Sequence, residues 1–368
     1  MKYGRIIVFL YIVAGYSLCS YAQNDIKTEL KDFDFVVYET EHNYSGFDFK
    51  INKNNIKEYK ALKKKLRKQV KNSERSGVEV SAELVGFFND YHFSLGNNEI
   101  HSSVYMTKPH ANYKDKMKEY NPQFVFGKVT DKTFFVRMPH YDYQDSVLSF
   151  ANKAVEEFKK SGCDNIIIDE RGNPGGSDRM FHPFVYLIAD HKGSFYSYKW
   201  LNTKDNRNFI DTSWRDNYGE LAERLVSQMD ATDDKYIVLD NDSLYVIDSI
   251  NTDAKPFKAA VIIDGCVASS GEFLIVFLRA CSNRFKVYGQ EPTLGCLDFA
   301  NAKRMRLPSR RAGINIPVSC PIFDNFIDDT GITPDVRIPL PLPDTLTDNI
   351  DSWLKWVARD MENNTTDR

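Results

Sequence analysis

The sequence lacks the signatures of several common function classes. It contains neither Gly-x-Ser-x-Gly nor His-Glu-x-x-His, which disfavours an α/β-hydrolase esterase and a zinc protease. The paired glycines at 175–176 are not followed by Gly-Lys-Ser/Thr, so they do not form a phosphate loop. The formal net charge is only -3 and the pI is about 6.2. This balance predicts neither nucleic acid nor an anionic membrane as a partner.

Long hydrophobic runs are also missing. The apolar run over residues 6–13 is too short to span a bilayer comfortably. Lys2 and Arg5 precede it, and Ser20 and Ala22 provide small residues at the two recognition positions of a secretory signal peptide. We therefore expect residues 1–22 to be removed and the protein to be periplasmic or secreted, with no stable membrane insertion after cleavage. A membrane anchor is the alternative.

Cysteine is scarce, with 6 residues in 368. Removal of residues 1–22 leaves an odd number, so at least one thiol does not pair within the chain. The spacings match no zinc ligand pattern, and we expect no metal and no other cofactor. Which cysteines pair is left open. The five are Cys163, Cys266, Cys281, Cys296 and Cys320.

The middle of the chain has an α/β pattern. A strand is predicted over 133–138, and a helical stripe over 147–158 ends at Gly162, a typical C-terminal cap. The aliphatic run over 165–169 is typical of a strand buried on both faces. Since this is a βαβ unit, we expect a parallel sheet.

A second strand-to-helix junction follows much later. Residues 259–264 form the predicted strand, 265–269 the turn and 271–281 an almost wholly apolar helix, which predicts burial. Between the junctions, residues 192–257 are polar and irregular, with a hairpin predicted over 236–250. We interpret them as an insertion, either a lid or specificity element or a surface decoration.

The two ends of the chain are predicted to be helical. Tyr59, Leu62, Leu66 and Val70 recur at helical spacing in the basic stretch 57–71, so its lysines and arginines are expected on a solvated face. A polybasic binding site is the alternative. Residues 80–89 continue as helix, and an amphipathic helix starting near residue 350 ends the chain.

Ser269 stands out because it joins a buried strand to a buried helix. The unpaired amides and the dipole at a helix N-terminus favour negative charge, which suits a nucleophile and the oxyanion that it creates. The amide of Ser270 is a natural donor to such an oxyanion. Alternatively, Ser269 or Ser270 merely caps the helix.

Four motifs, in order, resemble those of the C-terminal processing (tail-specific) serine peptidase family. Residues 169–176, Asp-Glu-Arg-Gly-Asn-Pro-Gly-Gly, resemble its Leu-Arg-x-Asn-Pro-Gly-Gly loop, and Ala-Ser-Ser-Gly-Glu at 268–272 resembles its nucleophile motif Ala-Ser-Ala-Ser-Glu. Residues 289–295 resemble Gly-Glu-Pro-Thr-x-Gly, and 331–336 resemble Gly-Ile-x-Pro-Asp-Val. Four motifs in family order are far more specific than any one of them.

The resemblance implies a crotonase/ClpP-like α/β core with a parallel-rich sheet, preceded by a small helical N-terminal domain. We therefore expect a helical domain over 23–100 that contributes His92, a peptidase core over 101–343, and a C-terminal helix and tail over 344–368. The segment between residues 99 and 124 is too short for the PDZ module common in relatives.

The resemblance also implies the site. Ser269 would be the nucleophile, and the amides of Ser270 and of Gly175 or Gly176 the oxyanion hole. Many relatives use a serine–lysine dyad, but Cys296 stands here where that lysine would follow Pro-Thr-x-Gly.

Another base is therefore needed. His92, within Asp-Tyr-His-Phe-Ser-Leu at 90–95, resembles the Asp-Gly-His-Thr-x-Leu segment of the histidine-using branch, which includes the tricorn protease core. Histidine suits general-base catalysis because its pKa lies near working pH. The analogy suggests Asp328 as the acid on the histidine side, with Asp329 adjacent and Ser94 as a possible relay.

These observations predict an exported serine peptidase that hydrolyses polypeptides through a Ser269 acyl-enzyme, with His92 as general base. The alternative is a catalytically inactive peptide- or ligand-binding protein on the same fold, because fold does not dictate function. The sequence leaves the cleaved bond, the natural substrate and the oligomeric state open.

Overall fold

The computed structural model describes residues 25–108, 113–193, 198–239, 257–322, 326–328 and 330–363. The expected signal peptide, most of the hairpin over 236–250, and Asp329 lie outside these residues. None of the helices in the described ranges is long and apolar enough to cross a membrane.

The chain forms two compact units, which are interleaved in sequence. The first unit consists of Met1–Lys108, Trp200–Ile237 and Phe299–Cys320; the second consists of Pro109–Lys199, Val238–Asp298 and Pro321–Arg368. These boundaries differ from the linear order expected from the sequence, because two later segments join the N-terminal region. Part of the expected insertion 192–257 thus belongs to the first unit.

The first unit begins with a helix over residues 25–42. Three further helices follow: α2 (Phe47–Lys50), α3 (Ile56–Lys71) and α4 (Gly77–Gly86). In α3 the predicted apolar face is buried at Tyr59, Leu66 and Val70, while Leu62, at its edge, is only partly buried. Ser76 and Glu79 form a capping box that starts α4, which ends earlier than the helix predicted to reach residue 89.

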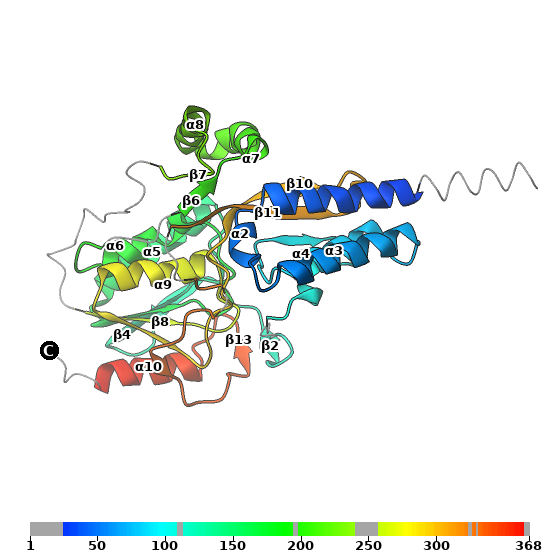
Figure 1. The fold of residues 1–368 in the computed structure, drawn as a ribbon. Coiled ribbons are helices and arrows are strands. Elements are labelled where there is room, and N and C mark those ends of the chain that lie inside the picture. The colour runs from blue at the N-terminus through cyan, green and yellow to red at the C-terminus, as the bar shows by residue number, and fades with distance from the viewer. Residues whose placement is uncertain are drawn as a thin grey trace, which may run out of the picture. The chain divides into compact units, whose positions relative to one another are not determined.

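Strands and helices from later segments complete the first unit. Its sheet has the order β1-β11-β6-β7, with β10 paired to β11. The strands are β1 (Ser94–Gly96), β6 (Tyr198–Leu201), β7 (Tyr236–Ile237), β10 (Ala300–Arg306) and β11 (Gly313–Pro321). The helical segments η1 (Ser102–Tyr105), α7 (Lys204–Phe209), η3 (Ile210–Trp214) and α8 (Arg215–Ala231) accompany them (Figure 1).

The second unit is built on a six-stranded sheet of order β12-β9-β8-β5-β4-β3. Only β3 is antiparallel to its neighbour; the other pairs are parallel, as the βαβ pattern predicted. The strands are β3 (Val125–Lys128), β4 (Thr133–Arg137), β5 (Asn165–Asp169), β8 (Lys258–Ile262), β9 (Phe285–Gly289) and β12 (Val336–Arg337). A separate pair joins β2 (Glu119–Tyr120) to β13 (Thr345–Leu346).

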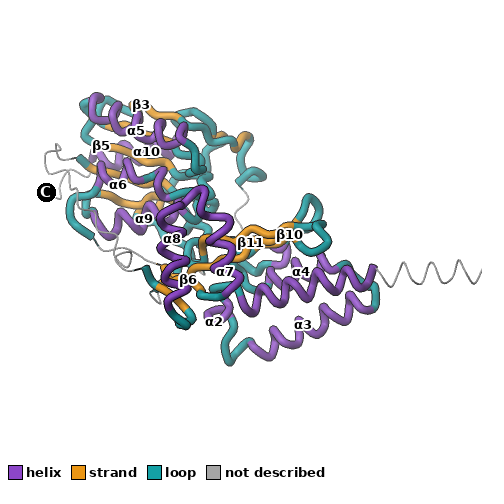
Figure 2. The backbone as a smooth tube through the Cα atoms, turned by 90° about the horizontal axis from the view of Figure 1, so that it is seen from above, coloured by secondary structure: helices purple, strands orange, loops and turns teal. Residues whose placement is uncertain are grey.

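Helices cover both faces of this sheet. One face packs against α5 (Asp145–Ser161), α6 (His182–Ile188), which follows the short turn η2 (Asp178–Met180), and α9 (Ser270–Cys281). The other packs against α10 (Ser352–Asn363), the predicted C-terminal helix (Figures 1 and 2). Alternation along β5 produces the two layers, since Ile166 and Ile168 face the first group and Ile167 faces α10. Gly162 ends α5 at φ 74, as predicted.

Candidate active site

Ser269 lies where β8 passes into α9, at the carboxyl edge of the parallel sheet, as predicted. Its backbone has φ 53 and ψ -120, a conformation that is costly for a residue with a Cβ. A serine that only caps a helix takes an extended conformation instead. Ser269 and Glu272 also form a capping box at the start of α9, as the alternative interpretation expected. Strained residues of this kind cluster at active sites, and on that ground Ser269 stays the predicted nucleophile.

The loop over residues 172–176, which we call the glycine loop, is hydrogen-bonded directly to the turn over residues 265–270, which we call the serine turn. The amide of Ala268 donates to the carbonyl of Asn173 at 3.0 Å, and the Ser270 hydroxyl donates to the carbonyl of Gly176 at 2.9 Å. Ser270 therefore uses its side chain to hold the glycine loop, while its amide is left at the start of α9. The first and second predicted motifs meet here.

Glycine at position 175 is required by this contact. A Cβ there would lie 2.7 Å from the carbonyl oxygen of Ala268, 2.7 Å from the Cβ of Ser269 and 2.8 Å from the amide of Ser270. The residue also has φ 97, which only glycine adopts readily. Backbone atoms of the glycine loop thus reach the serine turn with nothing between them.

The two glycines have different roles. The amide of Gly175 donates to the side-chain carbonyl of Asn173 at 2.8 Å, and the carbonyl of Gly175 accepts from the amide of Tyr141 at 2.8 Å. In a trans peptide the next N–H points away from that carbonyl, so the Gly176 amide points away from Tyr141. Within the described residues the amides of Gly176 and Ser270 have no hydrogen-bond acceptor. Of the two predicted glycine donors, the structure therefore favours Gly176.

Substitution of Gly175 by alanine is expected to lower the hydrolysis rate by about 10²-fold, the effect of displacing one oxyanion donor. The added methyl group must push the glycine loop and the serine turn apart. Peptidase assays on unfolded polypeptide would measure the loss. Gly127→Ala in β3 is the matched control, because its Cβ would meet nothing closer than 3.9 Å. Equal activity of the two variants would contradict this reading of the contact.

Glu272 in α9 holds the serine turn from the other side. Its buried carboxylate accepts hydrogen bonds from the amides of Ser269 (3.0 Å), Gly295 (2.7 Å) and Cys296 (2.8 Å) and from the hydroxyl of Thr293 (2.5 Å). Burial raises the pKa of Glu272, and these hydrogen bonds oppose the rise. The sequence placed Glu272 in a motif but did not indicate this role.

The third motif, at 289–295, and the fourth, at 331–336, are hydrogen-bonded to each other. The Ile332 amide donates to the Thr293 hydroxyl oxygen at 2.7 Å, and the Thr293 amide donates to the Ile332 carbonyl at 3.2 Å. All four motifs therefore meet around Ser269 within the second unit. Cys296, at the position of the family lysine, is buried, and its carbonyl accepts from the Ser269 amide at 2.9 Å.

Asp264 connects the serine turn to the glycine loop a second time. Its buried carboxylate accepts from the amides of Gly172 (3.2 Å) and Cys266 (2.9 Å) and from the hydroxyl of Tyr120 (3.3 Å). Burial raises the pKa of Asp264 to about 6, partly offset by the two amides. Sequence reasoning missed this residue because nothing in the pattern distinguishes it from an ordinary strand-end aspartate.

His92 belongs to the first unit, and hydrogen bonds of Asp90 and Phe299 fix its loop and its ring. The buried carboxylate of Asp90 accepts from the His92 amide at 2.9 Å and from the Tyr44 hydroxyl at 2.8 Å. The Nδ1 atom of His92 lies 2.6 Å from the carbonyl oxygen of Phe299. Because a carbonyl can only accept, Nδ1 carries the proton, and the lone pair of a neutral ring is on Nε2. This is the tautomer that a general base needs.

The remaining predicted residues have main-chain or amide partners. Oδ1 of the buried Asp328 accepts from the amides of Leu297 (2.6 Å) and Asp298 (2.8 Å), and Asp298 in turn accepts from the amides of Ile327 and Asp328. Ser94 in β1 accepts from the side-chain amide of Asn315 at 2.9 Å. The roles of Asp328 and Ser94 in catalysis stay predictions.

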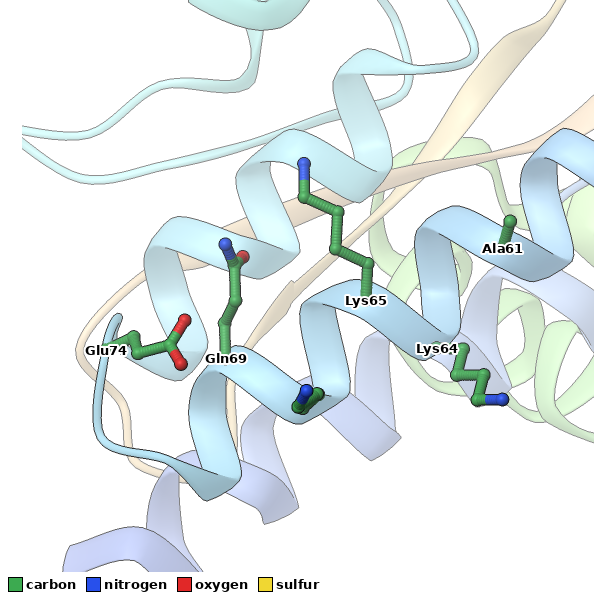
Figure 3. Close-up of a pocket in the computed structure, with 6 residues that line it drawn as sticks. Ala61, Lys64, Lys65, Gln69 and Glu74 are labelled. Carbon is green, nitrogen blue, oxygen red and sulfur yellow. The ribbon is translucent and has the colours of Figure 1, made fainter.

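Two hollows on the first unit lie elsewhere. One of about 450 Å³ is lined by α3 and the turn after it (Figure 3), and one of about 720 Å³ lies between α3, α4 and Tyr105. Neither is lined by a predicted catalytic residue. The lysines that line the first, Lys64, Lys65 and Lys68, are those expected on the solvated face of α3.

Comparison with known proteins agrees with the arrangement of motifs. The sequence matches the model for peptidase family S41 over residues 132–338, more than half of the chain. No curated protein matches by sequence.

Two solved structures share the fold over nearly the whole chain. Mature CPAF, solved in complex with lactacystin, is 13% identical, with a TM-score of 0.59 over 92% of this chain and 97% of that one. A lipoprotein from Streptococcus agalactiae is 14% identical, with a TM-score of 0.51 over 91% of this chain and 96% of that one. These likenesses confirm the predicted fold class.

Proposed function

The chain belongs to peptidase family S41 and is a serine peptidase, and from this premise we propose that it is exported and cleaves polypeptides through a Ser269 acyl-enzyme with His92 as general base. The observation that carries the proposal is the backbone of Ser269, strained at φ 53 at the start of a buried helix. Such strain persists only where surrounding contacts enforce it. Here Glu272 and Gly175 supply those contacts.

In the proposed first step, Nε2 of His92 takes the proton of the Ser269 hydroxyl, and Oγ attacks the carbonyl carbon of the peptide bond. The new oxyanion accepts from the amides of Gly176 and Ser270, which is supported by their having no other acceptor in the described residues. Collapse expels the amine, which takes the proton from His92. Water, deprotonated by His92, then releases the acyl group.

The proposal requires Nε2 of His92 to come within hydrogen-bond reach of Oγ of Ser269. Asp328 is proposed to act on the histidine side through the chain segment 297–299. Its contacts with the amides of 297 and 298 support this, since the carbonyl of the next residue accepts from His92. Ser94 or Asp329 as a relay belongs to the same proposal.

Labelling with a fluorophosphonate tests the acyl-enzyme directly, because the reagent traps an activated serine. We expect one covalent adduct, found by peptide mass spectrometry on Ser269. Saturable binding of unfolded polypeptide without any adduct would instead indicate a binding protein. Export is tested separately, since sequencing of the mature protein should begin at Gln23; an intact N-terminus would contradict it.

A further inference from the structure

Glu170 is an unusual residue at an important position. It follows β5 and stands where the family motif Leu-Arg-x-Asn-Pro-Gly-Gly has leucine. Its side chain is fully buried, yet no Lys, Arg or His forms an ion pair with it in the described part of the chain, and the neighbouring Arg171 pairs with Asp169 instead. A buried charge without a partner is costly, so a carboxyl group here needs either a proton or a specific reason to be ionised.

The carboxyl group has two polar contacts. The Asn173 side-chain amide donates to Oε2 at 2.7 Å, and Oε1 is hydrogen-bonded to the buried Tyr141 hydroxyl. A protonated Glu170 satisfies both, accepting from Asn173 and donating to the Tyr141 oxygen. Burial raises the pKa of Glu170 well above its ordinary value, and the nearby Asp169 adds to the rise. Burial favours the neutral carboxyl group, and the two hydrogen bonds can form in either protonation state.

Both partners of Glu170 hold the glycine loop. The other end of the Asn173 side chain accepts from the Gly175 amide, and the carbonyl of Asn173 accepts from Ala268. The Tyr141 backbone makes a hydrogen bond on each side of Gly176. Its amide donates to the Gly175 carbonyl, and its carbonyl accepts from the Ser177 amide at 2.7 Å. Glu170 thus joins the two groups that orient the Gly175–Gly176 peptide.

We propose that Glu170 is a positioning residue, whose buried carboxyl group clamps Asn173 to Tyr141 and so aims the Gly176 amide at the oxyanion. This inference rests on the proposed function. It adds a residue that the family motif does not contain, and it explains why this chain tolerates an acid in the core beside its glycine loop.

Glu170→Leu and Glu170→Gln separate the clamp from other roles. Glutamine keeps both hydrogen bonds of the neutral acid, whereas leucine leaves Asn173 and Tyr141 without them. With a fluorophosphonate, we expect Glu170→Leu to lower the maximal rate of serine capture by about 10²-fold and to leave the inhibitor's apparent affinity within about threefold. We expect Glu170→Gln to stay within about threefold of wild type in both quantities.

Hydrogen–deuterium exchange of the peptide covering 172–177 supplies a readout that does not need catalysis. Exchange should speed up about tenfold in Glu170→Leu and stay at the wild-type rate in Glu170→Gln, because only leucine releases the Gly175 amide through Asn173. If wild type captures no fluorophosphonate, the proposed function fails while this contrast still tests the clamp.

Two results would overturn the proposal. One is a Glu170→Leu variant whose capture rate and whose exchange over 172–177 both equal those of wild type. The other is an equal loss of capture rate in Glu170→Leu and Glu170→Gln, which would show that the charge of Glu170 matters and its hydrogen bonds do not. If Glu170→Leu does not fold, Tyr141→Phe replaces it, since it removes only the hydroxyl that meets Glu170. That variant should lower the capture rate about tenfold and speed exchange of 172–177. Wild-type values for both would reject the clamp.

Discussion

Replacement of Ser269 by alanine is expected to lower hydrolysis of an unfolded polypeptide by at least about 10⁴-fold while the protein stays folded. The substitution removes the attacking oxygen and leaves the amides of Gly176 and Ser270 in place. Alanine keeps the same Cβ and therefore the strain at φ 53, and loss of the serine's cap should lower the stability by only about 1 kcal/mol. Activity above about one hundredth of wild type would rule Ser269 out as the nucleophile.

Ser269→Gly is the informative companion. Glycine adopts φ 53 without steric cost, and relief of this strain should raise the free energy of unfolding by about 1–3 kcal/mol. The greater freedom of glycine in the unfolded chain lowers the same free energy by about 0.5–1 kcal/mol. The variant should therefore be as inactive as Ser269→Ala but more stable, by about 1 kcal/mol. Chemical denaturation of both variants would measure the difference. Equal stability would show that the serine turn stores no strain.

Replacement of His92 by alanine is expected to lower the rate by about 10³-fold or more, because Ser269 then has no base to take its proton. Added imidazole should restore part of the activity if the lost ring acted as a base. His42→Ala is the control, since that exposed histidine belongs to the same unit and makes its hydrogen bond and its ring contact with Tyr38, away from the predicted catalytic residues.

Two outcomes would contradict the role of His92. One is a His92→Ala variant with wild-type activity, and the other is a loss that imidazole leaves unchanged although the variant unfolds at the wild-type temperature. In the second case His92 would serve the loop through its contact with Phe299 and not the chemistry.

The sequence predicted the strands and helices around Ser269 because the signals there are local. The aliphatic run of β5 and the apolar helix α9 are buried as expected, and Gly162 ends α5 in the left-handed conformation. The family motifs placed Ser269 at the strand-to-helix junction. Each of these features depends on residues that are close together in the chain.

The division into units could not be predicted in the same way. Lys303 of β10 makes a buried ion pair with Glu39 at 2.7 Å, and Ser45 donates to the Ser319 carbonyl at 2.7 Å. The Asn206 side chain likewise donates to the Asn43 carbonyl at 3.1 Å. These contacts, which join the N-terminal region to 200–237 and 299–320, connect residues more than 150 positions apart and leave no periodic signal.

The sequence by itself therefore determined the family, the order of the motifs and the place of Ser269 at the strand-to-helix junction, since strand, helix and motif patterns depend on neighbouring residues. Only the tertiary structure showed that the Gly175 amide is already hydrogen-bonded to Asn173, whereas the Gly176 amide has no acceptor in the described residues. It also showed that Glu170, Asp264 and Glu272 hold the loops around Ser269. Burial and hydrogen bonding decide what an acidic side chain does, and both depend on partners that lie far away in the chain.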